Sequence, residues 1–548
     1  MSIFVVNLQL GFKINKKQNS KLKYCNYIFF YIEIDYLNMH HRSFFLSLRC
    51  FTSLLVLFYY QHVAAQSTVN FRWSNFQKAH KYANAIYLFK TLHGYGEVIT
   101  FNRSNRSFYK VSVYDSSLRI LLTKTFYVLK NKEKLLDINY FNNKLYFFTE
   151  VDLINQRKAL RYRMLSTNNL SGAVLKHDLL VQNETRFNRN LNYKLQTSDS
   201  FMSVWFEVPA PSESAKKQIR YCRFNGLMKQ MDDALIDLPI SNELCEILRF
   251  EAIKGGEFLI YAKEYAVRRI EQRAFAPNYK FVFFHINSDL SKLNACYLKD
   301  EQNFLEKGRL KMTNSILEAT GFFAEKTNHA KQGIWYIKYD FKANQKLIDT
   351  LMYFDNKVKS LPDNGFQASI TRRSNLELFY LDYFIKVNTS ERILVAEQFM
   401  IIPASFGSNY TYNRFYGDIL LLYLDENSYL VNAQRLLKSQ ETYNNFGEFS
   451  SYYLARQDTA LHFYYNEYFQ NKIKRKLKPL IWHKQSSLVV YKVTARQKEK
   501  VELANYKQVD GIIQVRDMIP LGTNSYLVYA FKKKRGKLGI LTLNQPKQ

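Results

Sequence analysis

A recurring strand–turn–strand pattern constrains the fold of this chain more than any other feature. One copy has an apolar run from Ile316 that ends at Glu325, a polar loop, and a second run, Gly333–Asp340, that turns into Lys346–Ile348. Runs like the second one recur eight times, at Phe108–Tyr114, Leu160–Leu165, Ile219–Phe224, Phe281–Ile286, Ile334–Tyr339, Ile419–Leu424, Leu488–Val493 and Leu538–Leu543. Most are followed directly by residues whose side chains favour turns, such as Asp115 and Asn225. The pattern predicts a series of β-hairpins.

Several of these runs are apolar on both faces, as in Ile419–Leu424 and Phe281–Ile286. Their short length and their β-branched and aromatic content favour strands over buried helices. A strand that is buried on both faces needs a cover on each side, and no helical segments of suitable length lie between these runs. Small antiparallel sheets stacked on one another would supply that cover, which is the arrangement of a β-propeller.

The spacing of the units and the end of the last one refine this prediction. Successive turns lie mostly about 50 to 70 residues apart, a period typical of propellers and repeat arrays. We therefore predict an all-β protein, a propeller of about eight four-stranded antiparallel blades, with seven as the alternative because the first unit is irregular. The last unit stops after its third strand at Leu543, and Val69–Trp73 is predicted to supply the missing fourth strand and close the ring.

The N-terminal region predicts an exported protein. Residues 39–65 contain His40–Arg42, an apolar core at Phe51–Tyr60 and the small residues Ala64 and Ala65, which is the pattern of a signal peptide. We expect cleavage after Ala65, a non-functional upstream extension at 1–38 and a single propeller domain at 66–548. The expected location is periplasmic or extracellular, peripheral to a membrane at most, and the expected state is a monomer.

The charge of the chain indicates its class of partner. There are 78 Lys and Arg against 47 Asp and Glu, a formal net charge of +31. Such an excess attracts anionic partners but does not determine a fold. For an exported protein we expect an anionic glycan, a lipopolysaccharide or an acidic envelope protein as the partner, and we do not expect nucleic acid.

Two blocks of the chain resemble a known group of proteins. The first, 316–340, contains Gly321–Glu325 and Gly333–Lys338, and the second, 394–465, contains Ala396–Phe399, Gly417–Leu420, Lys438–Gln440 and Ser450–Tyr452. These motifs, over roughly a third of the chain, resemble uncharacterised exported β-propeller-like proteins of Bacteroidota-type bacteria. The resemblance implies an envelope or secreted location and no particular activity.

A glutamate recurs at the same phase of six units, after the second strand of each. The six are Glu150, Glu207, Glu264, Glu325, Glu397 and Glu467. The functional interpretation is a ring of carboxylates that holds a cation or a basic ligand. The structural interpretation, which a residue repeated in every blade favours, is a bond made by each glutamate within the scaffold. Carbohydrate hydrolysis by a pair of them requires two carboxyls about 5 to 10 Å apart.

Two connections between second and third strands are unusually long, and we predict them to be binding loops on one face of the propeller. The first spans 405–416 and offers Tyr410, Tyr412, Arg414 and Tyr416. The second spans 470–483 and offers Lys472, Lys474, Arg475, Lys476 and Trp482. Aromatic rings stack on sugars, and cations attract sulfate, phosphate or carboxylate groups. The alternative is a solvated charged segment with aromatics packed beneath it.

Catalytic motifs are not found in the sequence. It contains no HExxH, GxSxG, GxxxxGK[ST] or EF-hand pattern, and we predict no metal site and no cofactor. The first hypothesis is a non-enzymatic propeller that binds a partner through its long-loop face. The alternatives are a propeller-fold carbohydrate-active enzyme that uses the repeated glutamates and a purely structural envelope protein.

Overall fold

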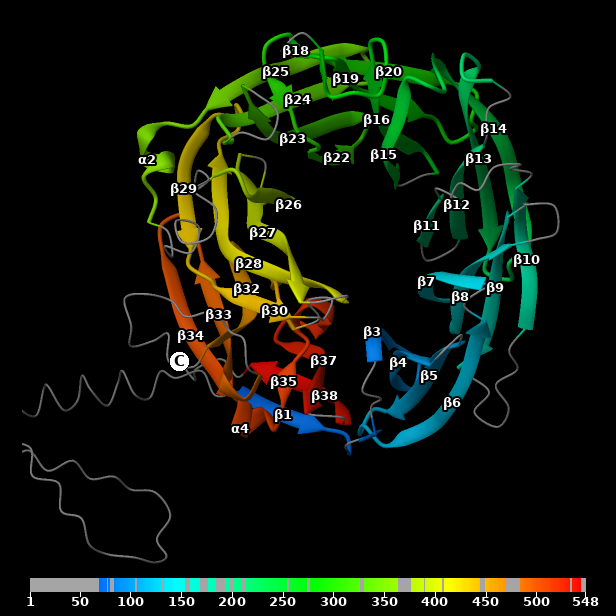
Figure 1. Cartoon of the computed structure of the whole chain (residues 1–548), viewed down its shortest axis with the longest axis vertical. Helices are drawn as coiled ribbons and strands as arrows, with labels where there is room; N and C mark the ends of the chain where they lie inside the picture. Colours follow the sequence, from blue (N-terminus) through cyan, green and yellow to red (C-terminus); the bar gives the residue numbers. More distant parts are fainter. Residues whose placement is uncertain are drawn as a thin grey trace, which may run out of the picture. The chain divides into compact units, whose positions relative to one another are not determined.

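The chain forms a β-propeller of eight antiparallel sheets, or blades (Figure 1). The computed structural model describes residues 69–543 apart from gaps, of which those of five or more residues are 153–157, 168–175, 184–192, 363–375, 444–448 and 469–482. The described residues all fall within one compact unit. The predicted upstream extension and signal peptide, 1–65, lie outside them. The predicted fold class is confirmed, with eight blades rather than seven.

The first four blades follow one another along the chain. Blade 1 consists of β3 (Ala83–Lys90), β4 (Gly94–Arg103), β5 (Arg106–Asp115) and β6 (Ile120–Leu129). Blade 2 consists of β7 (Glu133–Phe141), β8 (Lys144–Asp152), β9 (Lys158–Ser166) and β10 (Lys176–Asn183). Blade 3 consists of β11 (Tyr193–Thr197), β12 (Phe201–Val208), β13 (Lys216–Asn225) and β14 (Gln230–Ser241). Blade 4 consists of β15 (Cys245–Ala252), β16 (Phe258–Tyr265), β19 (Tyr279–Ile286) and β20 (Leu293–Leu298), with the small hairpin β17 (Gln272–Arg273) and β18 (Ala276–Pro277) between its second and third strands.

The last four blades carry additional short strands. Blade 5 consists of β21 (Phe304–Leu305) and β22 (Arg309–Thr313), which both pair with β23 (Ile316–Ala324), then β24 (Gly333–Asp340) and β25 (Gln345–Tyr353). Blade 6 consists of β26 (Phe379–Lys386), β27 (Arg392–Phe406), β28 (Asn409–Leu424), β29 (Leu430–Leu436) and β30 (Gln440–Tyr443). Blade 7 consists of β31 (Tyr453–Gln457), β32 (Ala460–Tyr468), β33 (Ser486–Val493) and β34 (Lys498–Asn505). Blade 8 consists of β35 (Ile512–Ile513), β36 (Ile519–Gly522), β37 (Ser525–Lys532), β38 (Arg535–Leu543), β1 (Val69–Trp73) and β2 (Gln77–Lys78).

In the described part of the chain, four short helical segments lie between strands. They are α2 (Asn356–Lys359), η3 (His483–Gln485), α4 (Tyr506–Val509) and η4 (Val515–Asp517). Among the described residues, no helix is long and apolar enough to cross a membrane.

The eight predicted runs are the third strands of the eight blades. They fall on β5, β9, β13, β19, β24, β28, β33 and β38. The predicted closure is also confirmed, because Val69 pairs with Leu543 and Trp73 with Gly539 in an antiparallel ladder between β1 and β38. One blade is therefore assembled from both ends of the described chain.

The turns after four third strands share one geometry. An Asx residue stands first, and the residue three positions later has a positive φ: Leu118 at 65°, Met228 at 61°, Leu290 at 65° and Ser428 at 68°. In the first of these turns, Asp115 Oδ1 accepts hydrogen bonds from the backbone N–H groups of Ser117 and Arg119, both at 2.8 Å. The Asx side chain thus replaces the glycine that such turns usually require.

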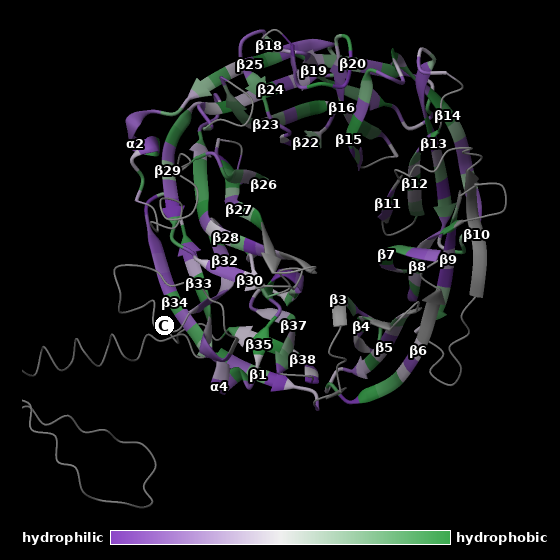
Figure 2. Ribbon diagram, in the orientation of Figure 1, coloured by the Kyte–Doolittle hydropathy of each residue, from purple (hydrophilic) through white to green (hydrophobic). Residues whose placement is uncertain are grey.

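The core lies between neighbouring blades. Trp205 of blade 3, for example, stacks on Tyr221 with ring centroids 3.9 Å apart and packs on Phe258 of blade 4 at 3.8 Å. All eight residues of β24 are buried or half-buried, whereas β14, an outermost strand, alternates exposed and half-buried residues over most of its length. Figure 2 shows the same contrast between the C-terminal part of β28, largely hydrophobic, and the outer strand β34, largely hydrophilic. Inner strands are covered on both faces and outer strands on one.

Candidate functional site

The repeated glutamates lie at one end of the blades. Four of them, Glu150, Glu207, Glu264 and Glu467, lie in the second strands near the end that leads to the third strand. Glu397 lies within the longer second strand β27, and Glu325 comes directly after β23. The ladders show the same phase: Glu207 pairs with Ile219 at the start of β13, and Glu264 with Lys280 at the start of β19. We call this end of the propeller the glutamate face.

Four of these glutamates are paired with lysines near them in the chain. Glu264 Oε2 lies 3.1 Å from Lys280 Nζ, and Glu467 Oε2 lies 2.5 Å from Lys500 Nζ. Glu207 pairs with Lys217 in the same way. Because each carboxylate is neutralised beside its own strand, these residues form separate ion pairs.

The remaining two glutamates differ in exposure, since Glu150 is buried and Glu325 is exposed. In the part of the chain that the structure describes, no three His, Cys, Asp or Glu side chains lie close enough together to hold a metal ion.

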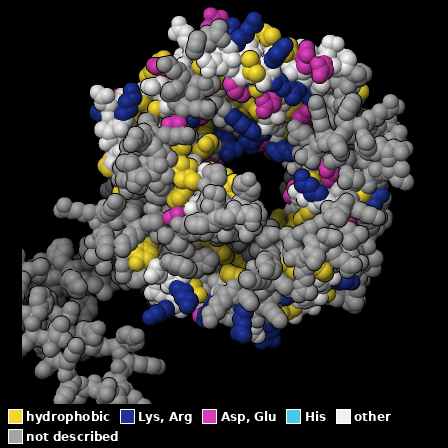
Figure 3. Space-filling model, in the orientation of Figure 1, with side chains coloured by type: hydrophobic (Ala, Val, Ile, Leu, Met, Phe, Trp, Pro, Cys, Tyr) yellow, Lys and Arg dark blue, Asp and Glu magenta, His cyan; other side chains and the backbone are white. Residues whose placement is uncertain are grey.

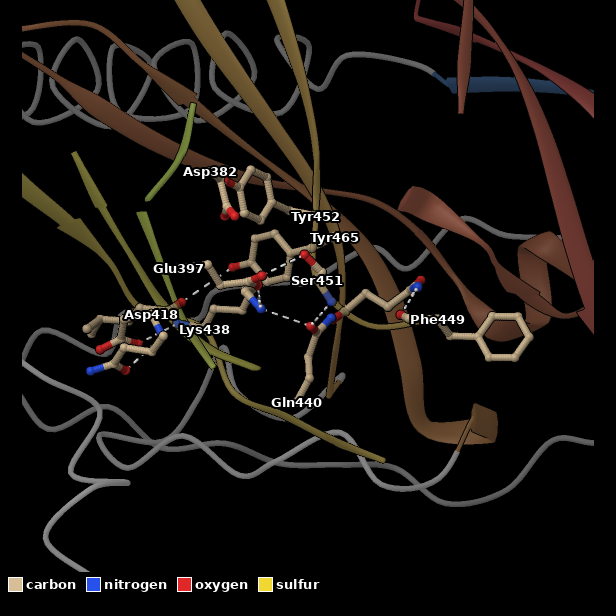
Figure 4. A network of polar contacts seen from close by, with 12 residues as sticks. Asp382, Glu397, Asp418, Lys438, Gln440, Phe449, Ser451, Tyr452 and Tyr465 are labelled. Atoms are coloured by element: carbon tan, nitrogen blue, oxygen red, sulfur yellow. Dashed lines mark hydrogen bonds and ion pairs between the residues drawn. The ribbon is translucent and has the colours of Figure 1, made fainter. Parts of the chain in front are cut away.

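The fourth pair belongs to a buried polar network between blades 6 and 7 (Figure 4). Lys438 has 0% exposure, and its Nζ lies 2.6 Å from Glu397 Oε1 and donates to Gln440 Oε1 at 2.9 Å. Glu397 Oε2 accepts a hydrogen bond from Ser451 Oγ at 2.7 Å. Both oxygens of Glu397 are therefore engaged. A carboxylate held in this way is poorly placed to act as a nucleophile or general base.

The network continues to an ion pair in blade 6. Asp418 Oδ1 accepts from the backbone N–H of Lys438 at 2.9 Å, and Asp418 Oδ2 accepts from Arg435 Nε at 2.7 Å. The side chains of Asp418 and Arg435 are 0% and 3% exposed. Buried charges of this kind are tolerated because each is paired and hydrogen-bonded.

Next to this network, an aspartate projects from the innermost strand of blade 6. The ladder between β26 and β27 shifts register between Leu381 and Tyr383, so Asp382 is the extra residue of a β-bulge. Tyr452 donates its hydroxyl to Asp382 Oδ2 at 2.8 Å. The pKa of Asp382 is raised to about 7, mainly by burial and also by the charge of Glu397, while the Tyr452 hydrogen bond and the charges of Arg309 and Lys438 oppose the shift.

The first predicted binding loop is instead a β-hairpin. Strands β27 and β28 continue through it, with Ser405 paired to Tyr410 and Phe399 to Tyr416, and β30 pairs with β28 at residues 413–416. We call this three-stranded extension the arm; in Figure 1 it points from blade 6 toward the centre of the ring. The positions of Tyr410, Tyr412, Arg414 and Tyr416 at every second residue were a strand signal, because alternate residues share one face of a strand.

The side chains of the arm differ in exposure. Tyr412 is 46% exposed, Arg414 is half-buried, and Tyr416 is buried, with its ring 4.9 Å from that of Phe399 and 5.7 Å from Lys438 Nζ. Tyr410 lies on β28, and its side chain is outside the description. Tyr416 is thus part of the packing beneath the arm rather than a free binding side chain. The second predicted loop, with Lys472, Lys474, Arg475, Lys476 and Trp482, lies outside the described residues.

The sequence analysis missed a cluster of cations on the innermost strands of blades 3, 4 and 5. The cluster, which we call the basic rim, consists of Lys194, Arg249, Lys307 and Arg309. Figure 3 shows Lys and Arg side chains gathered at the inner margin of the ring, where β11, β15 and β22 lie. The ladder places Lys194 opposite Trp205, two residues from Glu207, so this part of the rim adjoins the glutamate face.

Three of the four cations hydrogen-bond to main-chain carbonyls of another blade. Lys194 Nζ donates to Phe250 O at 2.7 Å and Lys307 Nζ to Leu248 O at 2.9 Å. Arg309 Nε donates to Leu381 O at 2.9 Å. Leu248 is the extra residue of a bulge in β15. These bonds fix the cations across blade boundaries, and a carbonyl acceptor leaves the positive charge of its donor uncompensated.

Carboxylates near the basic rim are fewer than its cations. Glu251 Oε2 accepts from Arg249 Nε at 2.7 Å and lies 3.9 Å from Lys194 Nζ. Among the described residues, no carboxylate lies within ion-pair distance of Lys307 or Arg309. Burial lowers the pKa of Lys307, and the charges of Arg309 and Arg249 lower it further. Burial also lowers the pKa of Lys194, as do Arg249 and Lys307, while Glu251 opposes them.

Comparisons with known proteins find solved structures of low similarity and no family. No family model matches the chain, and no curated protein matches it. Similar solved structures include the WD40 domain of SCAP from fission yeast, at 9% identity and a TM-score of 0.36 over 88% of this chain and 100% of that one. The β-propeller domain of the Trilobed protease from Pyrococcus furiosus has 7% identity and a TM-score of 0.30 over 77% and 98%.

The similar structures also include an enzyme. An oligogalacturonate lyase in complex with manganese has 9% identity and a TM-score of 0.34, over 88% of this chain and 99% of that one. Binding domains and enzymes thus both occur among these structures, and similarity at this level carries no argument about function.

Proposed function

We propose that the protein is a non-enzymatic β-propeller that binds an anionic ligand at the basic rim, beside the glutamate face. The single observation that carries this proposal is the convergence of Lys194, Arg249, Lys307 and Arg309 from three blades, with main-chain carbonyls as the main acceptors of three of them. Rigid scaffolds that converge several cations on one place are suited to anions.

The mutual repulsion of these cations supports the same proposal. Arg249 and Arg309 both disfavour the charged form of Lys307. A bound sulfate, phosphate or carboxylate group would reverse that effect, because an opposite charge nearby favours the charged form. The free energy of binding therefore includes relief of the repulsion between Lys307 and the two arginines.

The proposal also includes the cellular location of the protein. We propose that the protein is exported to the periplasm or the cell exterior, on the pattern of residues 39–65. In those compartments the candidate ligands are acidic glycans, lipopolysaccharide and acidic envelope proteins.

A binding measurement with matched charge variants tests the proposed function. The probes are dextran sulfate, polygalacturonate and polyphosphate, with neutral dextran as the blank. We expect Lys194→Gln combined with Lys307→Gln to weaken polyanion binding about tenfold, because each exposed charge contact is worth up to about 1 kcal/mol. The control, Lys299→Gln with Lys342→Gln, removes the same charge from exposed positions outside the rim.

The outcomes separate the rim from the overall charge of the protein. A loss confined to the rim variant supports the proposal. Equal effects of both double variants, or no binding of any polyanion by the unaltered protein, would overturn it.

The contacts of the repeated glutamates argue against a catalytic role for them. Glu397 has both oxygens engaged, and Glu207, Glu264 and Glu467 are each paired with a lysine. These contacts support a scaffold role, in which the ion pairs fix the ends of the second strands at the glutamate face.

A further inference from the structure

Two exposed tyrosines lie on the innermost strand of blade 6. Tyr380 is 53% exposed and Tyr383 is 42% exposed, whereas their neighbour Phe379 on the same strand is fully buried. About half of the surface of each tyrosine is therefore accessible to solvent. Isolated exposed aromatic residues are common, so only their surroundings can indicate whether they form a binding site.

Each of the two tyrosine rings packs against another aromatic ring of the protein. The ring of Tyr383 lies 6.1 Å from that of Tyr452, and the ring of Tyr380 lies 6.3 Å from that of Phe399 in an edge-on contact. Tyr452 is 4% exposed and directly precedes β31 of blade 7, and Phe399 lies on β27 where the arm begins, so both supports belong to the folded scaffold. Supported rings lose little conformational entropy when they bind a ligand.

The tyrosines adjoin the basic rim through Arg309. Its Nε donates to the carbonyl of Leu381, the residue that follows Tyr380. The guanidinium of blade 5 thus lies against the strand of blade 6 that carries both rings. The aromatic rings of blade 6 and the positive charge of Arg309 therefore lie side by side on the inner margin of the ring of blades.

A carboxylate with a free acceptor lies between the two rings in the sequence. Asp382 Oδ2 accepts from Tyr452, and its other oxygen has no hydrogen-bond partner among the described residues. A carboxyl oxygen with unused lone pairs accepts hydrogen bonds, so its complement on a ligand is a hydroxyl or an N–H group. A ligand suited to this place needs flat apolar faces, hydroxyl donors and acidic groups.

We propose that the ligand of the propeller is an acidic polysaccharide, with Tyr380 and Tyr383 stacking on its sugar rings, Asp382 accepting from its hydroxyls and the basic rim holding its carboxylate or sulfate groups. This inference rests on the proposed function and specifies its ligand class. Sugar rings present an apolar face of C–H groups to an aromatic ring and a margin of hydroxyls to polar side chains.

A single-stranded nucleic acid also combines flat rings with negative charge, but it suits this surface less well. Every nucleotide carries a phosphate, whereas an acidic glycan also has neutral hydroxyls that can face Asp382 and Glu251 while its acidic groups face the cations. A ligand with hydroxyls between its charges therefore fits this mixture of carboxyl groups and cations better.

The experiment compares ligands that share charge but differ in sugar. Affinities of the purified protein are measured for polygalacturonate and chondroitin sulfate, for polyphosphate, and for a single-stranded DNA oligomer. We expect Tyr380→Ala with Tyr383→Ala to weaken glycan binding about tenfold or more, as buried aromatic contacts at interfaces do, and to leave polyphosphate binding unchanged. The rim variant Lys194→Gln with Lys307→Gln should weaken both classes of ligand.

Two further variants protect the test against a folding defect. Tyr383→Phe keeps the ring and should retain glycan binding, and Tyr429→Ala removes a 62% exposed tyrosine from the turn at the opposite end of blade 6. All variants should keep the wild-type circular dichroism.

The outcomes distinguish the two proposals. Glycan affinity lowered only by the tyrosine pair and by the rim variant supports this inference. Binding of polyphosphate but not of glycans, or tyrosine-dependent binding of DNA alone, overturns the inference and leaves the anionic-ligand function standing. An unaltered protein that binds no polyanion overturns both.

Discussion

Lys438 and Glu397 form an ion pair 2.6 Å long inside blade 6, where the lysine side chain is completely buried. Neither partner is near bulk water, and Gln440 and Ser451 supply their remaining hydrogen bonds. Burial lowers the pKa of Lys438, and the charge of Glu397 opposes that change. Each charge therefore offsets the desolvation cost of the other, and removal of one leaves the other buried without a countercharge.

Replacement of one partner should destabilise the protein strongly. We expect Lys438→Met to lower the free energy of unfolding by about 3 to 5 kcal/mol, because it leaves the Glu397 carboxylate buried without its countercharge. Urea-induced unfolding followed by tyrosine fluorescence measures the change. Lys299→Met, which breaks an exposed pair with Glu301, is the control and should cost less than about 1 kcal/mol. Similar losses for the two variants would contradict this account.

The titration of Asp382 should appear in the pH dependence of stability. Its pKa is raised from 3.8 to about 7. Between these values the folded protein retains a proton that the unfolded chain releases, so the stability contributed by this carboxyl falls as the pH rises and levels off above about 7.

Asp382→Asn tests this sign directly. An amide does not titrate, so we expect the variant to gain stability over the wild type by about 1 to 3 kcal/mol between pH 4 and pH 7.5, at 1.36 kcal/mol per pKa unit at most. Thermal unfolding over that pH range measures it, with the exposed Glu301→Gln as the control. Parallel pH profiles for Asp382→Asn and the wild type would show that the carboxyl is not perturbed in this way.

The junction between β1 and β38 should be sensitive to a single methyl group. A Cβ atom on Gly539 would lie 2.2 Å from Trp73 Cε3, so Gly539→Ala must displace the indole from the closing strand. We expect a loss of about 1 to 3 kcal/mol, which is typical of overpacking. Gly522→Ala is the matched control, since nothing lies within 4 Å of its added Cβ. A thermal midpoint for Gly539→Ala equal to that of the control would rule out a tight junction.

Binding at the basic rim should depend on salt. The Debye length falls from about 10 Å at 0.1 M to about 3 Å at 1 M ionic strength, so attraction between the rim and a polyanion is screened over that range. We expect affinity for dextran sulfate to fall about tenfold or more over this interval, and the dependence to be weaker in Lys194→Gln with Lys307→Gln. Equal salt dependence in the variant and the wild type would place the binding charges elsewhere. Isothermal titration at three salt concentrations provides the measurement.

The propeller was predictable because third strands carry a strong local signal. Runs such as Ile419–Leu424 are apolar at every position, since they are covered on both faces, and they are followed by Asx turns that are legible in the sequence. The closing strand Val69–Trp73 was identified because the last unit ended one strand short.

The candidate site was less predictable because its members are distant in sequence. Lys194 and its acceptor Phe250 are 56 residues apart, Lys307 and Leu248 are 59 apart, and Arg309 and Leu381 are 72 apart. First strands such as β11 and β22 are only five residues long, too short for a periodic pattern to mark them. One cation in each of several successive first strands was the available signal.

The arm was misassigned for a different reason. A long connection rich in Ser, Asn and Gly resembles a loop, and the alternation of Tyr410, Tyr412 and Arg414 was read as a set of binding residues. The same alternation predicts a strand when a partner of similar length precedes it, as β27 does here.

The strand shared by the two ends of the described chain has a consequence for biosynthesis. Val69–Trp73 is made before any blade, yet its partner β38 follows all the other described strands. A nascent chain therefore carries seven complete sheets and one unpaired strand until residue 543 has left the ribosome. Any chaperone that protects this protein during synthesis has to protect that one segment longest.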